Sequence, residues 1–371
     1  MDKQERLISL DVFRGITIAG MILVNNPGTW DFIYPPLMHA AWHGCTPTDL
    51  VFPFFLFIVG VAITLSLSKR KDSGDNQTKL ILNIFRRSAL LFLLGLILSG
   101  FPEFDFSKIR IPGVLQRIAV VYLITALLFL KTKINTQIFF TIFFLILYWI
   151  LMTFIPVPGV GQANYELGTN LAAWLDSQLL SGHMWSVTKT WDPEGVLSTI
   201  PAISTSLIGV LTGHWLNKNI DKQKIIIGLF ISSSILMFLG YVWNGWFPMN
   251  KSIWTSSYVH YTGGLALNFL AICYYIIDVK KITWWIKPFQ VYGMNAITVF
   301  FLSGITGRIL YLIKITDDAG NKISISEFLF NNYFLSWLEP INASLLWAIV
   351  YVLIWLGLMW ILYAKKIFIK V

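Results

Sequence analysis

Charged residues are scarce in this chain of 371 residues, and cysteine is nearly absent. Asp, Glu, Lys and Arg together make up 13% of the sequence, and Cys45 and Cys273 are its two cysteines. An ordinary soluble domain carries about 25% charged residues, and a disulfide scaffold needs many more cysteines. Both classes are therefore excluded. A disordered chain is excluded as well, because 56% of the residues are hydrophobic.

Several common signatures are missing too. The sequence contains no P-loop, dinucleotide fingerprint, GxSxG, HExxH or CxxC motif. We therefore expect no bound metal. The net charge of +9 does not indicate nucleic-acid binding, because the basic residues lie in short groups between apolar runs and not in one stripe.

Long apolar runs recur from end to end, and the mean hydropathy is +0.66. A run of about 20 such residues predicts a membrane-spanning helix. Ten runs predict an all-α, polytopic transmembrane bundle in which residues 1–371 form a single domain, while the run 325–338 is too short to span. The expected spans are 7–27, 50–68, 80–100, 111–130, 134–155, 195–217, 223–243, 253–277, 284–306 and 342–364.

The basic residues give these spans a direction. With the N-terminus in the cytoplasm, 17 of the 28 lysine and arginine residues fall in inside segments, seven in outside segments and four within spans. Cytoplasmic loops carry such an excess. Both termini are therefore predicted to be cytoplasmic, with loops 28–49 and 156–194 on the outer side.

Ionisable residues inside spans are costly, so each needs a partner or a function. Asp11 and Arg14 are three residues apart on one helical face, where they can form an ion pair. Arg86 and Arg87 lie roughly 10 Å into the third span. Because they point about 100° apart, one can reach the headgroups while the other faces the interior, where a guanidinium suits a phosphate.

Two further polar groups lie in spans. Gln116 and Arg117 fall at the outer start of the fourth span, where Arg117 is placed for a ligand or a carboxylate partner. Asn295 puts an amide in the middle of the ninth span, beside Gly293. For Gly293 we favour close helix packing, and the role of Asn295 is left open.

The outer loop 28–49 is the best candidate for a site. It contains His39, His43 and Asp49 and no lysine or arginine, and imidazole exchanges protons near neutral pH. Asp49 has two interpretations: it caps the second span, or it orients a histidine as carboxylates do in catalytic triads. Asp192, which precedes a proline, is predicted to be the N-cap of the sixth span.

Several motifs, in this order, resemble the transmembrane heparan-α-glucosaminide N-acetyltransferase family, and its bacterial NagX-like members fit best by size. These motifs are LISLDVFRG (7–15), VN (24–25), HAAWHG (39–44), DLVFP (49–53), RIPGVLQR (110–117), DPEG (192–195), NKSIWTSSY (250–258) and YGMN (292–295). The human-type enzyme carries an ectodomain and an extra first helix ahead of this region. We therefore do not expect a lysosomal location or heparan as the acceptor to carry over.

The resemblance implies an integral, multi-pass enzyme of a bacterial inner or plasma membrane. It would transfer acetyl from cytosolic acetyl-CoA to the amino group of a glucosamine-type sugar or glycan on the outer side. The expected partners are that acceptor, acetyl-CoA, membrane lipid and, as one option, a second copy of the chain; nucleic acid is not among them.

The resemblance also implies His39, and not His43, as the active-site histidine, and it matches Asn25 to a family asparagine; Asp49 joins them as the candidate that can orient the histidine. His39 suits a general base, and a nucleophile that carries the acetyl group is the rival interpretation. Asn25 is suited to donate to the thioester oxyanion, and His183 is the reserve base. We expect the acetyl-CoA site to draw on Arg14, Arg86, Arg87, Gln116, Arg117 and Asn295.

Two other functions fit the same composition. One is a sugar or glycan transporter without covalent chemistry, and the other is an O-acetyltransferase of a cell-envelope polysaccharide. Release of free CoA from acetyl-CoA in the presence of an amino sugar would separate the transporter from the enzymes.

Overall fold

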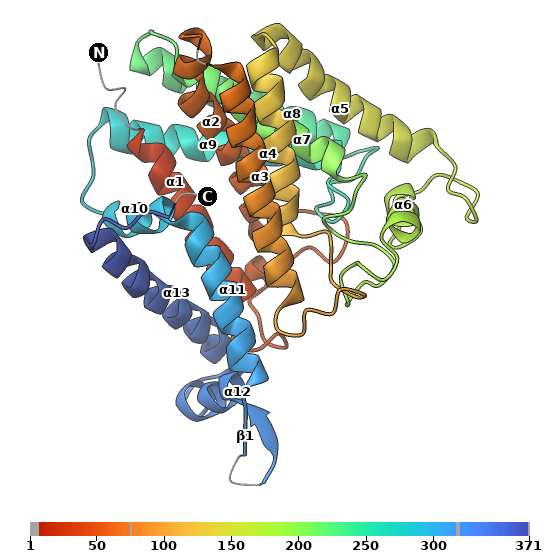
Figure 1. Ribbon diagram of the computed structural model, residues 1–371, viewed down its shortest axis with the longest axis vertical. Coiled ribbons are helices and arrows are strands. Elements are labelled where there is room, and N and C mark those ends of the chain that lie inside the picture. Colours follow the sequence, from red (N-terminus) through yellow and green to blue (C-terminus); the bar gives the residue numbers. More distant parts are fainter. Residues whose placement is uncertain (1–6, 75, 317–319, 370–371) are drawn as a thin grey trace. The chain divides into compact units, whose positions relative to one another are not determined.

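The computed structural model describes residues 7–74, 76–316 and 320–369, and within them the regular secondary structure is almost entirely helical (Figure 1). Lys3, Arg6 and Lys370, which contribute to the basic bias of the inside segments, lie outside these residues. In chain order the α-helices are α1 (Ile8–Asn25), α2 (Val51–Asp72), α3 (Gln77–Gly100), α4 (Val114–Lys131), α5 (Ile134–Phe154), α6 (Leu171–Leu179), α7 (Thr199–Leu216), α8 (Lys222–Trp243), α9 (Ser256–Cys273), α10 (Lys287–Met294), α11 (Ala296–Leu312), α12 (Ile325–Phe330) and α13 (Pro340–Ala364).

Short elements lie between the helices. The 3₁₀ turns η1 (Pro35–Leu37) and η2 (Pro47–Leu50) flank the loop that contains His39, and the π-helical turns η3 (Tyr274–Val279) and η4 (Asn331–Leu335) extend α9 and α12. Strand β1 (Lys314–Thr316) pairs antiparallel with β2 (Lys322–Ser324), and together they form a two-stranded sheet.

Eight helices of the described residues are long and apolar enough to cross a membrane, or nine if the bent pair α10 and α11 is one span. The predicted helical, multi-pass architecture is therefore confirmed. The remaining expected span, 195–217, corresponds to α7, which is an 18-residue helix. It is not among these eight, and it contains five serine and threonine residues, of which four are buried.

The expected single span 284–306 is not one straight helix. It is bent by 81° at Asn295, between α10 and α11. The Asn295 amide donates to Ile367 O at 3.1 Å and accepts from the Ile369 N–H at 3.0 Å, so the side chain at the break binds the segment that follows α13. No local pattern in the sequence indicates this contact.

The described residues fall into two compact units. The first comprises those of Met1–His39, Thr46–Val51 and Cys273–Lys370. Its helices α1 and α10 pack so closely that their glycines have no room for a side chain. A Cβ added to Gly15 would lie 1.8 Å from Phe289 O, and one added to Gly293 would lie 2.1 Å from Asp11 O. The predicted packing role of Gly293 is therefore confirmed.

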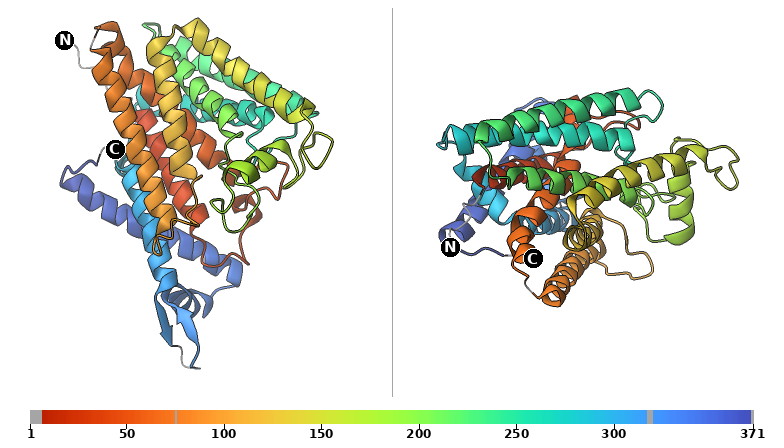
Figure 2. Two further views of the ribbon diagram at one scale, coloured as in Figure 1. Left: turned by 45° about the vertical axis from the view of Figure 1, so that its right-hand side comes forward. Right: turned by 90° about the horizontal axis from the view of Figure 1, so that it is seen from above.

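The second unit comprises Ala40–Cys45 and Phe52–Ile272, apart from the undescribed residue 75. Within it α3 and α4 run side by side (Figure 2). Helices α2 and α7 touch through glycines, since a Cβ on Gly60 would lie 1.9 Å from Ser206 O and one on Gly209 would lie 2.1 Å from Phe57 O. Small residues of this kind let helices approach closely in membranes.

Candidate active site

His39 and Asp49 meet in the first unit. The distance between His39 Nδ1 and Asp49 Oδ1 is 2.6 Å. The His39 side chain is 47% exposed, while that of Asp49 is 1% exposed. Among the described residues, His39 is the one histidine with a carboxylate within hydrogen-bond distance. With the Nδ1 proton held by Asp49, Nε2 is the ring nitrogen that can accept a proton.

Asp49 contacts His39 and also stabilises the start of η2, but it is not the N-cap predicted for the second span, because Thr46 is the N-cap and Asp49 stands at N3. Its Oδ2 accepts the Thr46 N–H at 2.9 Å, which closes the start of η2, and η2 leads directly into α2. Its other oxygen faces His39. A buried carboxylate is stable only when its oxygens are hydrogen-bonded, and here the helix start and the histidine each satisfy one of them.

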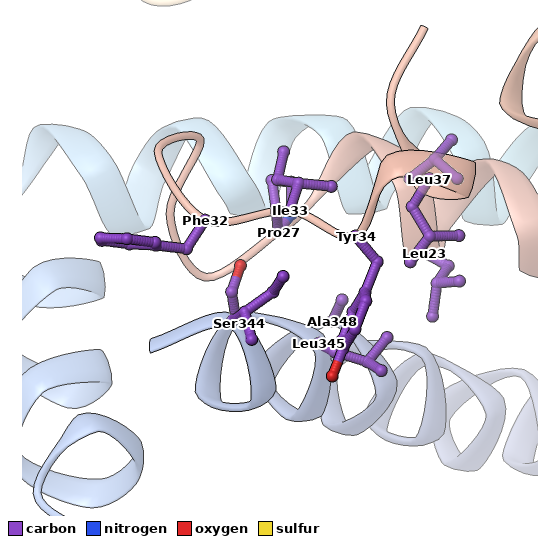
Figure 3. Close-up of a pocket in the computed structure, with 11 residues that line it drawn as sticks. Leu23, Pro27, Phe32, Ile33, Tyr34, Leu37, Ser344, Leu345 and Ala348 are labelled. Atoms are coloured by element: carbon purple, nitrogen blue, oxygen red, sulfur yellow. The ribbon is translucent and has the colours of Figure 1, made fainter. Parts of the chain in front are cut away.

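The chain before His39 is fixed against α13, also within the first unit. An apolar groove lies between this segment and α13, and Figure 3 shows the Tyr34 side chain extending toward Leu345 and Ala348 of α13. The Tyr34 hydroxyl donates to Asn342 Oδ1 at 2.6 Å, and Ser344 Oγ accepts the Thr29 N–H at 3.2 Å. The groove has almost no polar lining, so it positions the loop and offers nothing to a charged ligand.

Asn25 is the last residue of α1 and is exposed. No hydrogen bond of the described residues uses its amide, and none joins it to His39 or Asp49. The structure thus pairs two of the three predicted catalytic residues and leaves the third as an amide without a partner.

A second polar cluster lies in the second unit, around Arg110. Its Nε donates to Asp192 Oδ2 at 2.8 Å and its Nη2 to Asp192 Oδ1 at 2.6 Å, and Nη2 also donates to Glu194 Oε2. Burial alone would lower the pKa of Arg110, but the two carboxylates raise it overall. Asp192 therefore does not cap the sixth span as predicted. Helix α7 begins only at Thr199, and its N-cap residue is Ser198.

Asp176 of α6 is hydrogen-bonded to the segment that contains Asp192 and Glu194. It accepts the backbone N–H groups of Asp192 at 3.2 Å and Val196 at 2.9 Å. A Cβ on Gly195 would lie 2.0 Å from Asp176 Oδ2, so only glycine fits there. Burial raises the pKa of Asp176 to about 6, although the two N–H donors act in the opposite direction. The DPEG segment is therefore folded around one buried carboxyl group.

Arg117 of α4 is 2% exposed. Its Nη2 donates to Gly195 O at 3.1 Å and to Ser198 Oγ, and its guanidinium lies 5.2 Å from the centre of the Trp254 ring. Among the described residues no atom accepts a hydrogen bond from Nε or Nη1. A buried cation with two unsatisfied donors is costly, so this site is suited to a ligand that brings acceptor oxygens.

Gln116, next to Arg117, has a packing role. Gly95 and Gly113 both lie against Gln116 Oε1. A Cβ added to Gly95 would be 2.3 Å from this oxygen, and one added to Gly113 would be 2.6 Å from it. Gln116 Nε2 donates to Ser99 Oγ at 3.4 Å. The side chain thus fills the contact between α3 and the start of α4.

Arg86 and Arg87 on α3 are both exposed, and neither faces a buried interior. Arg87 lies over the ring of Tyr122 on α4, 4.9 Å from its centre. No hydrogen bond of the described residues uses either guanidinium. The structure does not bring them to Arg117.

Arg14 forms the predicted ion pair with Asp11, at 3.3 Å, and also donates to Gly293 O at 3.2 Å. It therefore connects α1 to the end of α10. Asn295 follows at the bend, where its amide is already engaged by the backbone after α13. Arg14 and Asn295, both predicted to bind acetyl-CoA, therefore take part in contacts between helices of the first unit.

The reserve base His183 contacts no carboxylate. Its Nδ1 donates to Ile109 O at 2.9 Å, and the Ile111 N–H donates to His183 O at 2.9 Å, so it holds the strand-like entry to α4. Sequence reasoning missed the pairing of Arg110 with Asp192 and Glu194. The available signal was the presence of complementary charges in two outer loops, RIPG and DPEG.

The sequence matches one family of known proteins. A family model described as "Heparan-alpha-glucosaminide N-acetyltransferase, catalytic" matches residues 6–242. The chain is similar to the heparan-alpha-glucosaminide N-acetyltransferases of Mus musculus and Homo sapiens, with 31% identity over 424 and 429 residues. Each alignment covers 99% of this chain, and the chain spans 60% of the length of each relative.

The elevated pKa of Asp176 predicts a pH effect on stability. An unfolded aspartate titrates near its usual value of about 3.9, whereas the folded carboxyl keeps its proton up to a pH of about 6. Folding stability should therefore fall as pH rises through this interval, by about 3 kcal/mol at most. In Asp176→Asn this loss should be absent, so the melting temperature of the wild type relative to the variant should be higher at pH 4 than at pH 7. Parallel melting curves across that range would contradict the assignment.

Proposed function

The chain belongs to the heparan-α-glucosaminide N-acetyltransferase family, and from this premise we propose that it transfers an acetyl group from acetyl-CoA to the amino group of a glucosamine-type sugar or glycan. The observation that carries the proposal is the contact between His39 Nδ1 and the buried carboxylate of Asp49. Both residues lie within the matched segment 6–242. A histidine oriented in this way is the base that acylation of an amine requires.

The same proposal assigns sides to the reaction. The excess of basic residues in one set of loops supports cytoplasmic termini and places loop 28–49 on the outer side. Acetyl-CoA is then drawn from the cytosol, and the sugar is acetylated at the opposite surface. The acetyl group thus crosses the membrane through the protein.

The chemistry follows from the orientation of the ring. The ammonium group first loses one proton to water. As the resulting amine attacks the thioester carbonyl, a C–N bond forms, the C–S bond breaks, and His39 Nε2 takes the second nitrogen proton. Asp49 stabilises the imidazolium that results, and the departing CoA sulfur recovers the proton. In the rival route Nε2 attacks first and carries the acetyl group, and both routes use the same nitrogen.

Asn25 is proposed to donate to the oxygen that becomes negative during this attack. Its amide is exposed and is not used by another hydrogen bond of the described residues. One such donor is typically worth about 3 kcal/mol in enzymes that form an oxyanion.

Arg117 is proposed to bind acetyl-CoA through a phosphate or carbonyl oxygen. Its Nε and Nη1 have no acceptor among the described residues, and its burial strengthens any charge-assisted hydrogen bond to a ligand. Arg86 and Arg87 are exposed on α3 and are proposed to contact the nucleotide phosphates of acetyl-CoA.

The function is tested in sealed, right-side-out membrane vesicles loaded with acetyl-CoA and supplied with labelled glucosamine outside. The wild type should form labelled N-acetylglucosamine and release CoA inside. His39→Ala should lower the rate by about 10²–10⁴-fold, because the base is lost, while His183→Ala serves as the control and should keep the rate. A wild-type rate in His39→Ala would refute the assignment, and glucosamine uptake without acetylation would favour the transporter.

The acetyl-CoA contact is tested with Arg117→Gln, which keeps hydrogen-bonding capacity but removes the charge. The KM for acetyl-CoA should rise by roughly 10- to 150-fold, since a charge-assisted hydrogen bond to a phosphate is lost. Lys224→Gln, at an exposed position of α8, is the matched control. An unchanged KM in an Arg117→Gln protein of normal melting temperature would exclude Arg117 from the acetyl-CoA site.

A further inference from the structure

Aromatic side chains gather around Trp42 in the second unit. Trp42 Nε1 donates to Tyr165 O at 2.8 Å, and its ring meets the ring of Trp191 edge to face with the centres 5.3 Å apart. Trp42 and Tyr165 also pack on the apolar cluster that contains Tyr148 and Phe247. Trp42, Tyr165 and Trp191 are each half-buried. They therefore form a rigid wall that still reaches the surface.

His43 follows Trp42 and is exposed in a fixed orientation. The Asn250 amide donates to His43 Nδ1 at 3.4 Å, which places the ring proton on Nε2. Burial lowers the pKa of His43, and Glu166 partly offsets this. Among the described residues no partner accepts a hydrogen bond from Nε2. The neutral ring therefore offers one N–H donor to a ligand.

The backbone of Glu166 is fixed by two hydrogen bonds, whereas its carboxylate makes none among the described residues. Its N–H donates to Asn164 Oδ1 at 3.0 Å, and its carbonyl accepts from Asn170 Nδ2 at 2.8 Å. The side chain is exposed and takes part in no hydrogen bond or ion pair of the described residues. The sequence also contains no lysine or arginine in 156–188 or in 28–49, so neither loop provides its own cation for this carboxylate.

We propose that Trp42, His43 and Glu166 form the subsite that binds the amino-sugar acceptor, a proposal that rests on the proposed function. An amino sugar carries an ammonium group, hydroxyls and an apolar C–H face. Glu166 pairs with the ammonium group, His43 Nε2 donates to a hydroxyl, and the Trp42 ring covers the C–H face.

The position of this subsite along the chain suits the reaction. Trp42 follows His39 by three residues, so chain connectivity alone keeps their Cα atoms within about 11 Å.

Acetylation converts the ammonium group into a neutral amide, which no longer pairs with Glu166. The subsite thus favours the substrate over the product and promotes product release.

The test measures sugar binding to the purified full-length protein without acetyl-CoA, by calorimetry with glucosamine and with N-acetylglucosamine. The wild type should bind glucosamine more tightly. Glu166→Gln should weaken glucosamine binding by about threefold to tenfold, as expected for an exposed charge pair with a ligand, and should leave N-acetylglucosamine binding unchanged. Glu103→Gln removes another exposed carboxylate of the second unit and should behave like the wild type.

Kinetics give the second readout. In Glu166→Gln the KM for glucosamine should rise by the same factor, while kcat and the KM for acetyl-CoA stay unchanged. Unaltered glucosamine affinity and KM in Glu166→Gln would overturn the subsite even if the wild type transfers acetyl. Binding that depends on Glu166 in a protein that transfers no acetyl would leave the subsite standing and refute the proposed function.

Discussion

The buried carboxylate of Asp49 connects the start of a helix to a histidine. Its two oxygens accept from different parts of the chain, the Thr46 N–H at the start of η2 and Nδ1 of His39. At 1% exposure an ionised carboxylate requires both contacts. The position of His39 is therefore set by a rigid element, although the residue itself lies in a loop. A base held in this way needs no rearrangement before it accepts a proton.

The two arginines of the RIPGVLQR motif differ in how far the protein itself satisfies their hydrogen-bond donors. Arg110 is saturated by Asp192 and Glu194, so its charge is neutralised within the protein. Arg117, seven residues later, meets a carbonyl, a hydroxyl and an aromatic ring, and two of its donors have no acceptor among the described residues. The first arginine connects two loops of the second unit, and the second keeps two donors that a ligand can satisfy under the proposed function.

Features that depend on neighbouring residues could be predicted from the sequence. Span lengths follow from the length of apolar runs, and the packing role of Gly293 follows from its size. The pairing of His39 with Asp49 was one of two interpretations, because ten residues separate them and the same aspartate also suited a helix start. The 81° bend at Asn295 and the contact between Arg110 and Asp192 were missed, since each depends on a partner more than 70 residues away. Local propensity indicates neither.

The most direct measurement is the acetyl-transfer rate of Asp49→Asn at unchanged stability. The amide oxygen can still accept the Thr46 N–H, but the NH₂ group then faces His39 Nδ1 and donates to it. The ring proton moves to Nε2, and the base is lost. The account predicts a melting temperature close to that of the wild type and a rate lower by about 10²–10⁴-fold. A wild-type rate in a stable Asp49→Asn protein would contradict it.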